Sequence, residues 1–288
     1  MPESDWLVDT SGGFDGSSAP TAPPLDDAQQ KKWKKALKKR SQQLYELQQT
    51  FYADRRFSLL LVFQAMDAAG KDSTIRHVFR GVNPAGFQVS SFKQPSANEL
   101  AHDFLWRTSN ALPERGRIGI FNRSYYEESL VVRVHPEYLG GQQLPAEPEP
   151  NSEAFWQARY ESIVEHEKHL ARNGSVVLKF WLNVSREEQH RRFAERLERP
   201  EKNWKFSAGD LKESARWDEY MSAYDETLKA TSKPWAPWYA IPADDKPFAR
   251  YAVADIVVRT MRSLGLRYPE LTAKQQSELS QYRQQLIV

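Results

Sequence analysis

The segment LLLVFQAMDAAGKDSTIRHVF, residues 59–79, constrains the fold of this chain more than any other feature. Its five leading apolar residues predict a strand buried on both faces, and the pattern from Lys71 onward predicts a helix directly behind a short loop. In this arrangement, backbone N–H groups of the loop and of the helix start point at one anion, and the helix dipole adds to the attraction. The segment therefore predicts a phosphate-binding loop.

The loop departs from the common pattern G-x-x-x-x-G-K-[ST] at two positions. Ala65 replaces the first Gly, and Asp72 replaces the Ser or Thr that normally binds Mg²⁺. Gly70 lets the backbone approach an oxygen closely, and Lys71 is expected to reach the terminal phosphates. The loop residues expected to contact phosphate are Ala65, Met66, Ala68, Ala69, Gly70, Asp72 and Ser73.

Asp67 is a carboxylate inside a loop that collects negative phosphate charge. Without a partner it would repel the ligand. Its presence is explained if it binds the Mg²⁺ that the missing hydroxyl would have held, if it accepts a proton from the attacking group, or both. An Asp that caps the turn through its own backbone is the structural alternative.

A second predicted strand, residues 118–121, is followed by the sequence NRSYYEE. Asn122 and Arg123 should therefore lie at the carboxyl edge of the sheet, where open α/β folds bind ligands. The neutral amide of Asn122 leaves Asp67 as the principal anionic metal ligand, and Arg123 can make forked hydrogen bonds to phosphate. Two further cations could extend this positive surface, namely Lys93 and Arg133. For each of them a surface salt bridge is the alternative.

Short apolar runs alternate with helical patterns along most of the chain. The expected strands are residues 59–63, 87–92, 118–121, 176–184 and 238–241. The expected helices are residues 71–82, 97–112, 153–173, 186–198, 208–230 and 246–264. This alternation predicts a parallel five-stranded α/β sheet with helices on both faces.

Residues 1–25 are rich in Ser, Gly, Pro and Asp, and we expect them to form a flexible tail. Residues 26–288 are expected to form a single domain. Its first helix, from Asp26, carries seven cationic side chains between Lys31 and Arg40. We interpret this run as a solvated helix face rather than as a polyanion-binding arm.

Basic residues gather again over residues 186–216, around Trp204 and Phe206. We expect these residues to form a helical lid, because phosphoryl transfer is favoured when positive charge closes over the moving group. Pairing with neighbouring Glu residues is the alternative for each single Arg. Asp210 is interpreted as a second Mg²⁺ contact, with a helix cap as the alternative. The lid residues expected to contact phosphate are Arg192, Arg196, Arg199 and Lys205.

Composition excludes several other classes of protein. The 288 residues contain no cysteine, which rules out disulfides and thiol chemistry. Forty basic and 38 acidic side chains give a net charge of +2, too balanced for a protein that coats nucleic acid or an anionic membrane. Because no export signal and no membrane-spanning apolar run is found, we expect a cytoplasmic protein.

Several ordered stretches resemble the family 2 polyphosphate kinases, among them FQAMDAAGKDSTIRHVF, FNRSYYEESLVVRVHPEYL, WKFSAGD and KPWAPWYAIPADDKPFAR. The resemblance covers about residues 30–265. It implies a thymidylate-kinase-like P-loop fold that uses Mg²⁺ to transfer phosphate between polyphosphate and nucleotides. It also implies that Asp67, Lys71, Asn122 and Arg123 carry the site. The NRSYYEE version is similar to the subgroup that phosphorylates both nucleoside mono- and diphosphates.

The main hypothesis is a Mg²⁺-dependent polyphosphate:nucleotide phosphotransferase that acts on AMP, ADP or both. Its expected partners are inorganic polyphosphate and adenine nucleotides, with guanine nucleotides as further candidates. The resemblance also implies a homodimer or homotetramer. Two alternatives stay open: an ATP-dependent nucleotide kinase, for which the loop alone would serve, and a non-catalytic polyanion-binding protein that relies on the Lys-rich helix and the lid.

Overall fold

Five parallel strands form one sheet in the computed structural model, which describes residues 4–23 and 30–286. The strands are β1 (Ser58–Gln64), β2 (Phe87–Ser91), β3 (Ile118–Asn122), β4 (Ser175–Asn183) and β5 (Trp238–Pro242). Their order across the sheet is β2-β3-β1-β4-β5, so β1 lies at the centre between β3 and β4. This confirms the predicted sheet and places the loop behind β1 in its middle.

A row of aromatic rings crosses β1, β4 and β5. Phe63 lies opposite Phe180, and Phe180 lies opposite Tyr239, with ring centroids 5.1 Å and 5.7 Å apart. Such pairs each contribute about 0.5–1.5 kcal/mol beyond the burial of their area. All seven residues of β1 are buried, as expected for a central strand covered on both faces.

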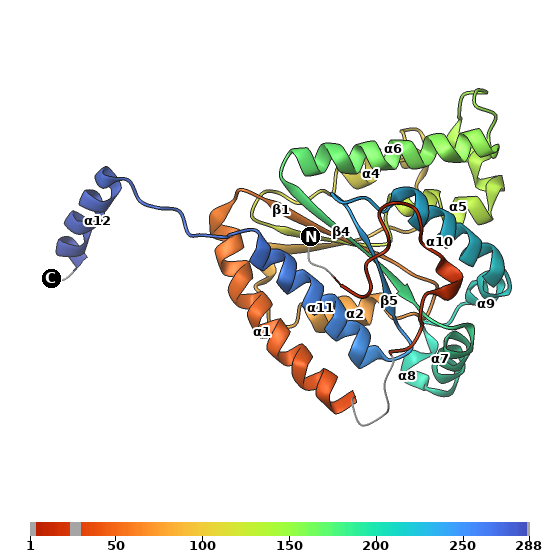
Figure 1. Ribbon diagram of the computed structural model, residues 1–288, viewed down its shortest axis with the longest axis horizontal. Helices are drawn as coiled ribbons and strands as arrows, with labels where there is room; N and C mark the ends of the chain where they lie inside the picture. Colours follow the sequence, from red (N-terminus) through yellow and green to blue (C-terminus); the bar gives the residue numbers. More distant parts are fainter. Residues whose placement is uncertain (1–3, 24–29, 287–288) are drawn as a thin grey trace.

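Helices cover both faces of the sheet, with the two groups on opposite sides of it in Figure 1. One group consists of α1 (Gln30–Asp54), α2 (Lys71–Val78) and α11 (Lys246–Ser263), in which α11 packs against both of the others. The other contains α6 (Glu153–Arg172) and α10 (Trp217–Thr231), which contact each other, and α6 also packs on β4. The predicted α/β architecture is therefore confirmed.

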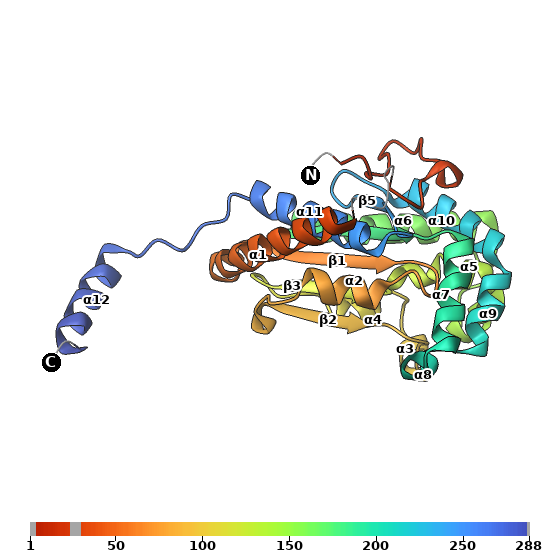
Figure 2. The same ribbon diagram turned by 90° about the horizontal axis from the view of Figure 1, so that it is seen from below.

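The lid helices lie beyond the carboxyl ends of the strands (Figure 2). They are α7 (Arg186–Glu198), α8 (Pro200–Asn203) and α9 (Ala208–Ala215). The prediction of one continuous helix over residues 208–230 was wrong, because the helix is interrupted at Arg216. This break separates α9 in the lid from α10, which packs against α6.

The prediction of one helix over residues 97–112 was also wrong. The structure has two shorter helices there, α3 (Ala97–Leu100) and α4 (Trp106–Ser109). Between them the Asp103 carboxylate accepts a hydrogen bond from Leu105 N at 2.9 Å. Such a local bond competes with helical hydrogen bonding and favours a turn. The remaining short segments are α5 (Val131–Val134) and the 3-10 helices Gly16–Ser18, Pro84–Gly86, Tyr125–Glu128 and Pro136–Gln142.

The N-terminal segment, residues 4–23, pairs with the free edge of β5 instead of forming the expected flexible tail. Val8 N donates to Trp238 O at 2.9 Å, and Ala240 N donates to Trp6 O at 2.8 Å. Val8 is fully buried. The composition offers few apolar anchors, but an unpaired strand edge supplies backbone partners that composition does not reveal.

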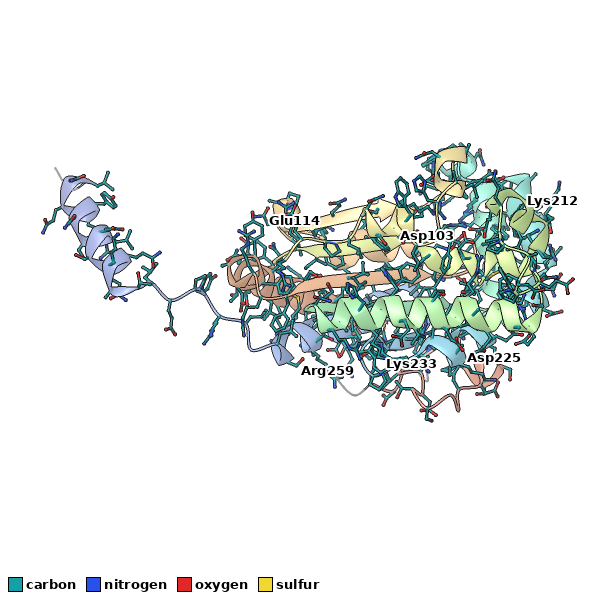
Figure 3. All side chains as sticks on the ribbon, turned by 90° about the horizontal axis from the view of Figure 1, so that it is seen from above. Asp103, Glu114, Lys212, Asp225, Lys233 and Arg259 are labelled. Carbon is teal, nitrogen blue, oxygen red and sulfur yellow. The ribbon has the colours of Figure 1, made fainter. Side chains whose placement is uncertain are left out.

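The same segment continues across α10 towards the carboxyl edge of the sheet. Gly16 N donates at 2.8 Å to the carboxylate of Asp225, which is labelled in Figure 3. Asp244 N, just beyond β5, donates to Thr21 O at 2.9 Å. The expectation of a flexible tail is therefore wrong for residues 4–23, and the rest of the expected tail lies outside the described residues.

At the other end of the chain, α12 (Ala273–Leu286) extends away from the sheet on an irregular segment (Figure 1). None of its residues is buried, and the sequence pattern did not predict it. No helix within residues 4–23 and 30–286 is long and apolar enough to cross a membrane.

A buried ion pair anchors the chain directly behind the end of β3. Lys179 Nζ lies 2.6 Å from Glu167 Oε2, and both side chains are fully buried. The hydroxyls of Tyr125 and Tyr126 donate to Glu167 Oε1 at 2.8 Å and 2.9 Å. Burial lowers the pKa of Lys179 and raises the pKa of Glu167, while their mutual attraction opposes both shifts. The pair therefore holds the two tyrosines that follow the strand end.

We expect Lys179→Met to lower the free energy of unfolding by about 3–5 kcal/mol, because Glu167 would stay buried without its cation. The double variant Lys179→Met/Glu167→Gln should be more stable than this single variant, since it leaves no uncompensated charge. Urea unfolding followed by tryptophan fluorescence measures both. A double variant that is less stable than Lys179→Met would contradict this account.

Candidate active site

The loop between β1 and α2 has the backbone shape of an anion cradle. Gly70 has φ 107° and Ala68 has φ 62°, both in the left-handed region. Such residues turn successive N–H groups towards one side, where they can surround an anion. A side chain at position 70 would be strained by this φ and would bring a Cβ within 3.3 Å of Ser73 Oγ. The loop geometry supports the predicted phosphate cradle.

Lys71, the first residue of α2, is held against the loop. Its Nζ donates to Ala65 O at 2.6 Å and to Met66 O at 3.4 Å. Burial lowers the pKa of Lys71 to about 8, and repulsion from Arg123 contributes, while Asp67 opposes the shift. An ammonium group has three donors, so Lys71 can also bind a phosphate oxygen placed in the loop.

Arg123 links the carboxyl ends of β1 and β3. Its Nη2 donates to Asp67 Oδ1 and its Nη1 donates to Glu127 Oε2, both at 2.9 Å. Gln64 Nε2 donates to the other oxygen of Glu127 at 2.9 Å. Glu127 and Asp67 raise the pKa of Arg123 despite its burial. These two bonds use two of the five guanidinium donors, so Arg123 can orient Asp67 and still bind an oxyanion.

Asn122, at the end of β3, contacts the start of α2. Its Nδ2 donates to Asp72 Oδ1 at 2.6 Å, and its backbone lies opposite Phe63 of β1. This bond uses one of the two amide N–H donors, and the amide oxygen can accept from water or contact a cation. The structure thus brings Asp67, Lys71, Asn122 and Arg123 together, as predicted.

Asp67 and Asp210 are the two carboxylates that the sequence predicts as Mg²⁺ contacts. Burial raises the pKa of Asp210, and the negative charge of Asp67 raises it further. Mg²⁺ is commonly held by one or two carboxylates together with water and substrate phosphates. The pair suits this arrangement, whereas no cluster of three or more His, Cys, Asp or Glu within the described ranges could hold a metal alone.

The alternatives for these two carboxylates do not match the structure. Ser207 caps α9 by accepting a hydrogen bond from Gly209 N at 3.1 Å, so Asp210 is not the cap. Asp210 instead accepts from Arg196 Nη1 at 2.8 Å. The Asp67 carboxylate is bonded to Arg123 rather than to the backbone of its own turn. Asp67 lines the cleft in front of the loop, whereas Asp210 is held by Arg196 and is not among the described residues that line this cleft.

The cleft in front of the loop has a volume of about 830 Å³, and half of the residues that line it are cationic. Of the cations predicted from the sequence, those that line it are Lys71, Lys93, Arg123, Arg192, Arg196 and Lys205. Four further cations line it that were not among the predicted site residues: Arg76, Lys202, Lys246 and Arg250. Lys246 and Arg250 could have been found by the argument used for Arg123, because they follow the carboxyl end of β5.

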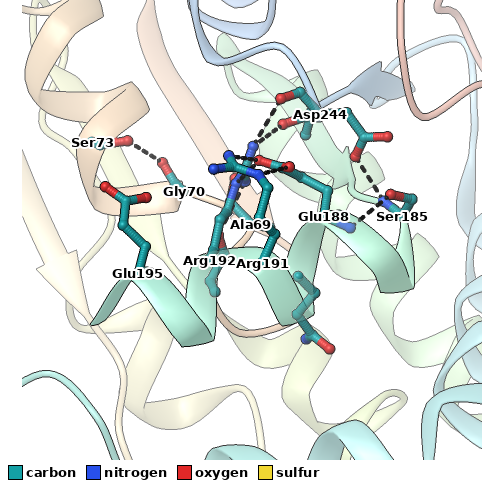
Figure 4. Close-up of polar contacts among 12 residues, drawn as sticks. Ala69, Gly70, Ser73, Ser185, Glu188, Arg191, Arg192, Glu195 and Asp244 are labelled. Carbon is teal, nitrogen blue, oxygen red and sulfur yellow. Dashed lines mark hydrogen bonds and ion pairs between the residues drawn. The ribbon is translucent and has the colours of Figure 1, made fainter. Parts of the chain in front are cut away.

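Arg192 braces the loop instead of contacting phosphate (Figure 4). Its side chain is 3% exposed, and its Nε donates to Glu188 at 2.6 Å. One terminal nitrogen donates to the carbonyls of Ala68 and Ala69, and the other to those of Ala243 and Asp244. All five donors are occupied, so none is left for a ligand. This corrects the predicted phosphate contact.

Arg199 and Arg133 do not line the cleft, and we correct both predictions. Arg199 pairs with Glu195 at 3.0 Å, and its side chain is 53% exposed. Arg133, on α5, pairs with Glu226 at 2.9 Å and lies over the ring of Trp156. The salt-bridge alternative describes both residues, because each has an acidic partner within reach that sequence spacing alone cannot rank against a ligand.

The chain is similar to proteins of one family over most of its length. The family model described as "Polyphosphate kinase 2" matches residues 27–267. An ADP-polyphosphate phosphotransferase of Rhodopseudomonas palustris is 55% identical over 251 residues, covering 87% of this chain and 86% of the relative. An AMP/ADP-polyphosphate phosphotransferase of Meiothermus ruber is 45% identical over 235 residues, covering 82% and 83%. The crystal structure of polyphosphate kinase 2 from Arthrobacter aurescens TC1 matches with a TM-score of 0.81, 34% identity and coverage of 96% and 95%.

The shifted pKa of Lys71 predicts how phosphate binding depends on pH. Below about pH 8 the free protein already carries the charged amine, so this group adds no pH dependence. Above this pH a proton must be taken up on binding, and the affinity for inorganic tripolyphosphate should fall by up to about tenfold per pH unit. Titration calorimetry with a chelator present measures this.

The control for this experiment is Lys246→Met, because burial and Arg192 also lower the pKa of Lys246 to about 8. Lys71→Met should bind more weakly and lose more of the pH dependence than Lys246→Met, because Lys71 begins α2 at the loop itself, whereas Lys246 begins α11. An unchanged pH dependence in Lys71→Met would assign the effect to another group.

Proposed function

The chain belongs to the polyphosphate kinase 2 family, in the subgroup that acts on nucleoside mono- and diphosphates, and from this premise we propose how its site transfers phosphate. It is a polyphosphate:nucleotide phosphotransferase with a P-loop kinase-like fold. We propose that it moves the terminal phosphoryl group of inorganic polyphosphate to ADP or AMP, with Mg²⁺ at Asp67 and Asp210. The observation that supports this best is the bridge from Arg123 to Asp67 and Glu127.

In this proposal the loop and two cations bind the reacting end of the polyphosphate. The N–H groups of the loop and of the first turn of α2 surround the phosphate oxygens. Lys71 and the free donors of Arg123 bind the group that moves, where negative charge is concentrated during transfer. Arg196 and Lys205 add positive charge from the lid side. The chain's contribution to catalysis is therefore mainly positioning and charge stabilisation.

The transfer itself needs no strong base from the protein. The bond between the terminal phosphorus and its bridging oxygen breaks, and that oxygen keeps the electron pair on the shortened polyphosphate. A new bond forms between this phosphorus and an oxygen of the nucleotide's last phosphate. The second pKa of a phosphate monoester is about 6, so this oxygen is already largely deprotonated at neutral pH. We therefore assign Asp67 to cation binding and orientation rather than to proton transfer.

Bound Mg²⁺ would supply charge neutralisation between the two phosphate groups. Arg123 holds the carboxylate of Asp67 at 2.9 Å, which fixes the direction in which that ligand points. Gln189, from α7, donates to Asp67 O at 3.0 Å and fixes the backbone of the same residue. Asp67 is thus restrained through both its side chain and its main chain.

The first experiment incubates the purified protein with Mg²⁺, polyphosphate and either ADP or AMP, and measures ATP. We expect ATP from ADP, and ADP followed by ATP from AMP. A parallel reaction with ATP and AMP but no polyphosphate tests the ATP-dependent kinase. Faster transfer in that reaction than with polyphosphate would contradict the proposed donor.

The second experiment replaces Arg123. We expect Arg123→Ala to lower kcat by about 10²–10³, as for other donors aimed at a developing charge. Arg199→Ala is the matched control, because Arg199 lies on the lid outside the cleft and should leave kcat within about twofold. Steady-state rates with ADP measure both, and equal losses in the two variants would remove Arg123 from the proposed role.

Several expectations from the sequence stay predictions. They are the cytoplasmic location, the homodimeric or homotetrameric state, the use of guanine nucleotides, the single domain over residues 26–288 and the identity of the metal as Mg²⁺. The non-catalytic polyanion-binding alternative disagrees with the family to which the chain belongs.

A further inference from the structure

A second cleft lies beside the active site, between α1, α2 and α11, and has a volume of about 920 Å³. We call it the α1 groove. Its cationic side chains are Lys34 and Lys38 on α1, Arg80 just after α2, and Arg250 on α11. Lys34 and Lys38 are four residues apart and therefore share one face of the helix. The Lys-rich run of α1 is thus divided between solvent and a groove.

The α1 groove is lined by positive charge without an acidic partner. Among the described residues that line it there is no Asp or Glu. Lys34, Lys38 and Arg80 form no ion pair within the described ranges, whereas Arg40 on the same helix pairs with Asp255 at 2.6 Å. Most lid arginines likewise have a glutamate or aspartate partner. Uncompensated cations in one groove favour an anionic ligand.

Arg250 is incompletely satisfied within the protein. Its Nε is buried and has no hydrogen-bond partner, and its Nη2 lies 3.5 Å from Ser73 Oγ. Burial lowers the pKa of Arg250, and the positive charges of Arg76 and Arg192 lower it further. A buried donor without a partner is unfavourable, so a ligand that offers an acceptor to this guanidinium would be stabilised.

The neighbouring His77 experiences the same positive potential. Burial lowers the pKa of His77. The positive charges of Arg250, Arg76 and Arg80 lower it further, whereas the hydrogen bond to Ser73 O opposes the shift. Arg76 on α2, Arg80 just after α2 and Arg250 on α11 therefore act on one ring.

The α1 groove and the active-site cleft meet at one residue. Arg250 lines both clefts. Arg76, on α2, lines the active-site cleft, and Arg80, two residues beyond the end of α2, lines the α1 groove. In Figure 1, α2 and α11 lie between the sheet and α1. A row of cations thus leads from Lys71 past Arg76 and Arg250 to α1.

We propose that the α1 groove binds the distal part of a long polyphosphate chain whose end is reacting at the loop. This inference rests on the proposed function. A linear polyanion suits a row of separated cations, whereas a mononucleotide would reach only one part of it. Binding at a second site on the same molecule raises the effective concentration of the reacting end, so long chains should bind more tightly than short ones.

The test compares long-chain polyphosphate with tripolyphosphate in the triple variant Lys34→Ala/Lys38→Ala/Arg80→Ala. We expect the KM for long chains to rise by about tenfold or more, with kcat unchanged and the Kd for tripolyphosphate unchanged. The control Lys31→Ala/Lys35→Ala/Lys39→Ala removes three charges from solvent-exposed positions of α1 outside the groove. It should change the KM for long chains by less than about threefold.

The outcomes separate this inference from the proposed function. If wild type makes no ATP from polyphosphate of any length, the proposed function fails. If wild type is active but the groove variant keeps its preference for long chains, only the groove assignment fails. Equal KM increases in both variants would indicate a general charge effect and would also overturn the groove assignment. Single-stranded RNA that displaces long chains from wild type and binds the groove variant more weakly would assign the groove to nucleic acid instead.

His77 provides a direct reporter. Long-chain polyphosphate in the groove should raise the pKa of His77, because nearby negative charge offsets the three arginines. Ring-proton NMR measures this shift, and the His77→Gln variant identifies the signal. Tripolyphosphate should shift the signal less. No difference between the two ligands would contradict the proposal.

Discussion

The central position of β1 is the constraint on which the site depends. This parallel strand lies between β3 and β4 and is buried along its whole length. The chain leaves the sheet only at the carboxyl end of the strand. At that edge the loop turns directly into α2, while the end of β3 places Asn122 and Arg123 beside it. The anion cradle, the carboxylate and the guanidinium therefore meet because of strand order rather than sequence distance.

Two arginines at this edge illustrate how hydrogen bonding decides function. Arg192 uses all five donors on a carboxylate and four carbonyls, so it stabilises the loop and the segment after β5. Arg123 uses two donors on carboxylates, which leaves capacity for phosphate. The side chains are chemically identical, and the difference comes from their surroundings. The same reasoning distinguishes Arg250, with an unsatisfied nitrogen, from the paired Arg133.

Much of the fold and of the central site could be predicted, because both depend on short-range patterns. Short apolar runs, several of them nearly continuous, predicted all five strands, and the strand, loop and helix sequence predicted the cradle with Asp67 and Lys71. The errors share one cause, which is long-range contact. Residues 4–23 are ordered by the free edge of β5, and Arg199 and Arg133 are occupied by partners that spacing could not select. Lys246 and Arg250 join the cleft from a strand end more than 170 residues beyond the loop.

The sequence by itself determined the residue types and the local backbone of the loop: Gly70 permits the left-handed turn, Lys71 follows at the helix start, and Asp67 replaces the missing hydroxyl. Only the tertiary structure decided which cations remain free to bind phosphate. Local conformation follows from neighbouring residues in the sequence. Whether a charged side chain already has hydrogen-bond partners depends instead on every group that packing brings within hydrogen-bond distance. For the same reason the Lys-rich helix, a solvated face by its pattern, lines a cationic groove once α2 and α11 are packed against the sheet.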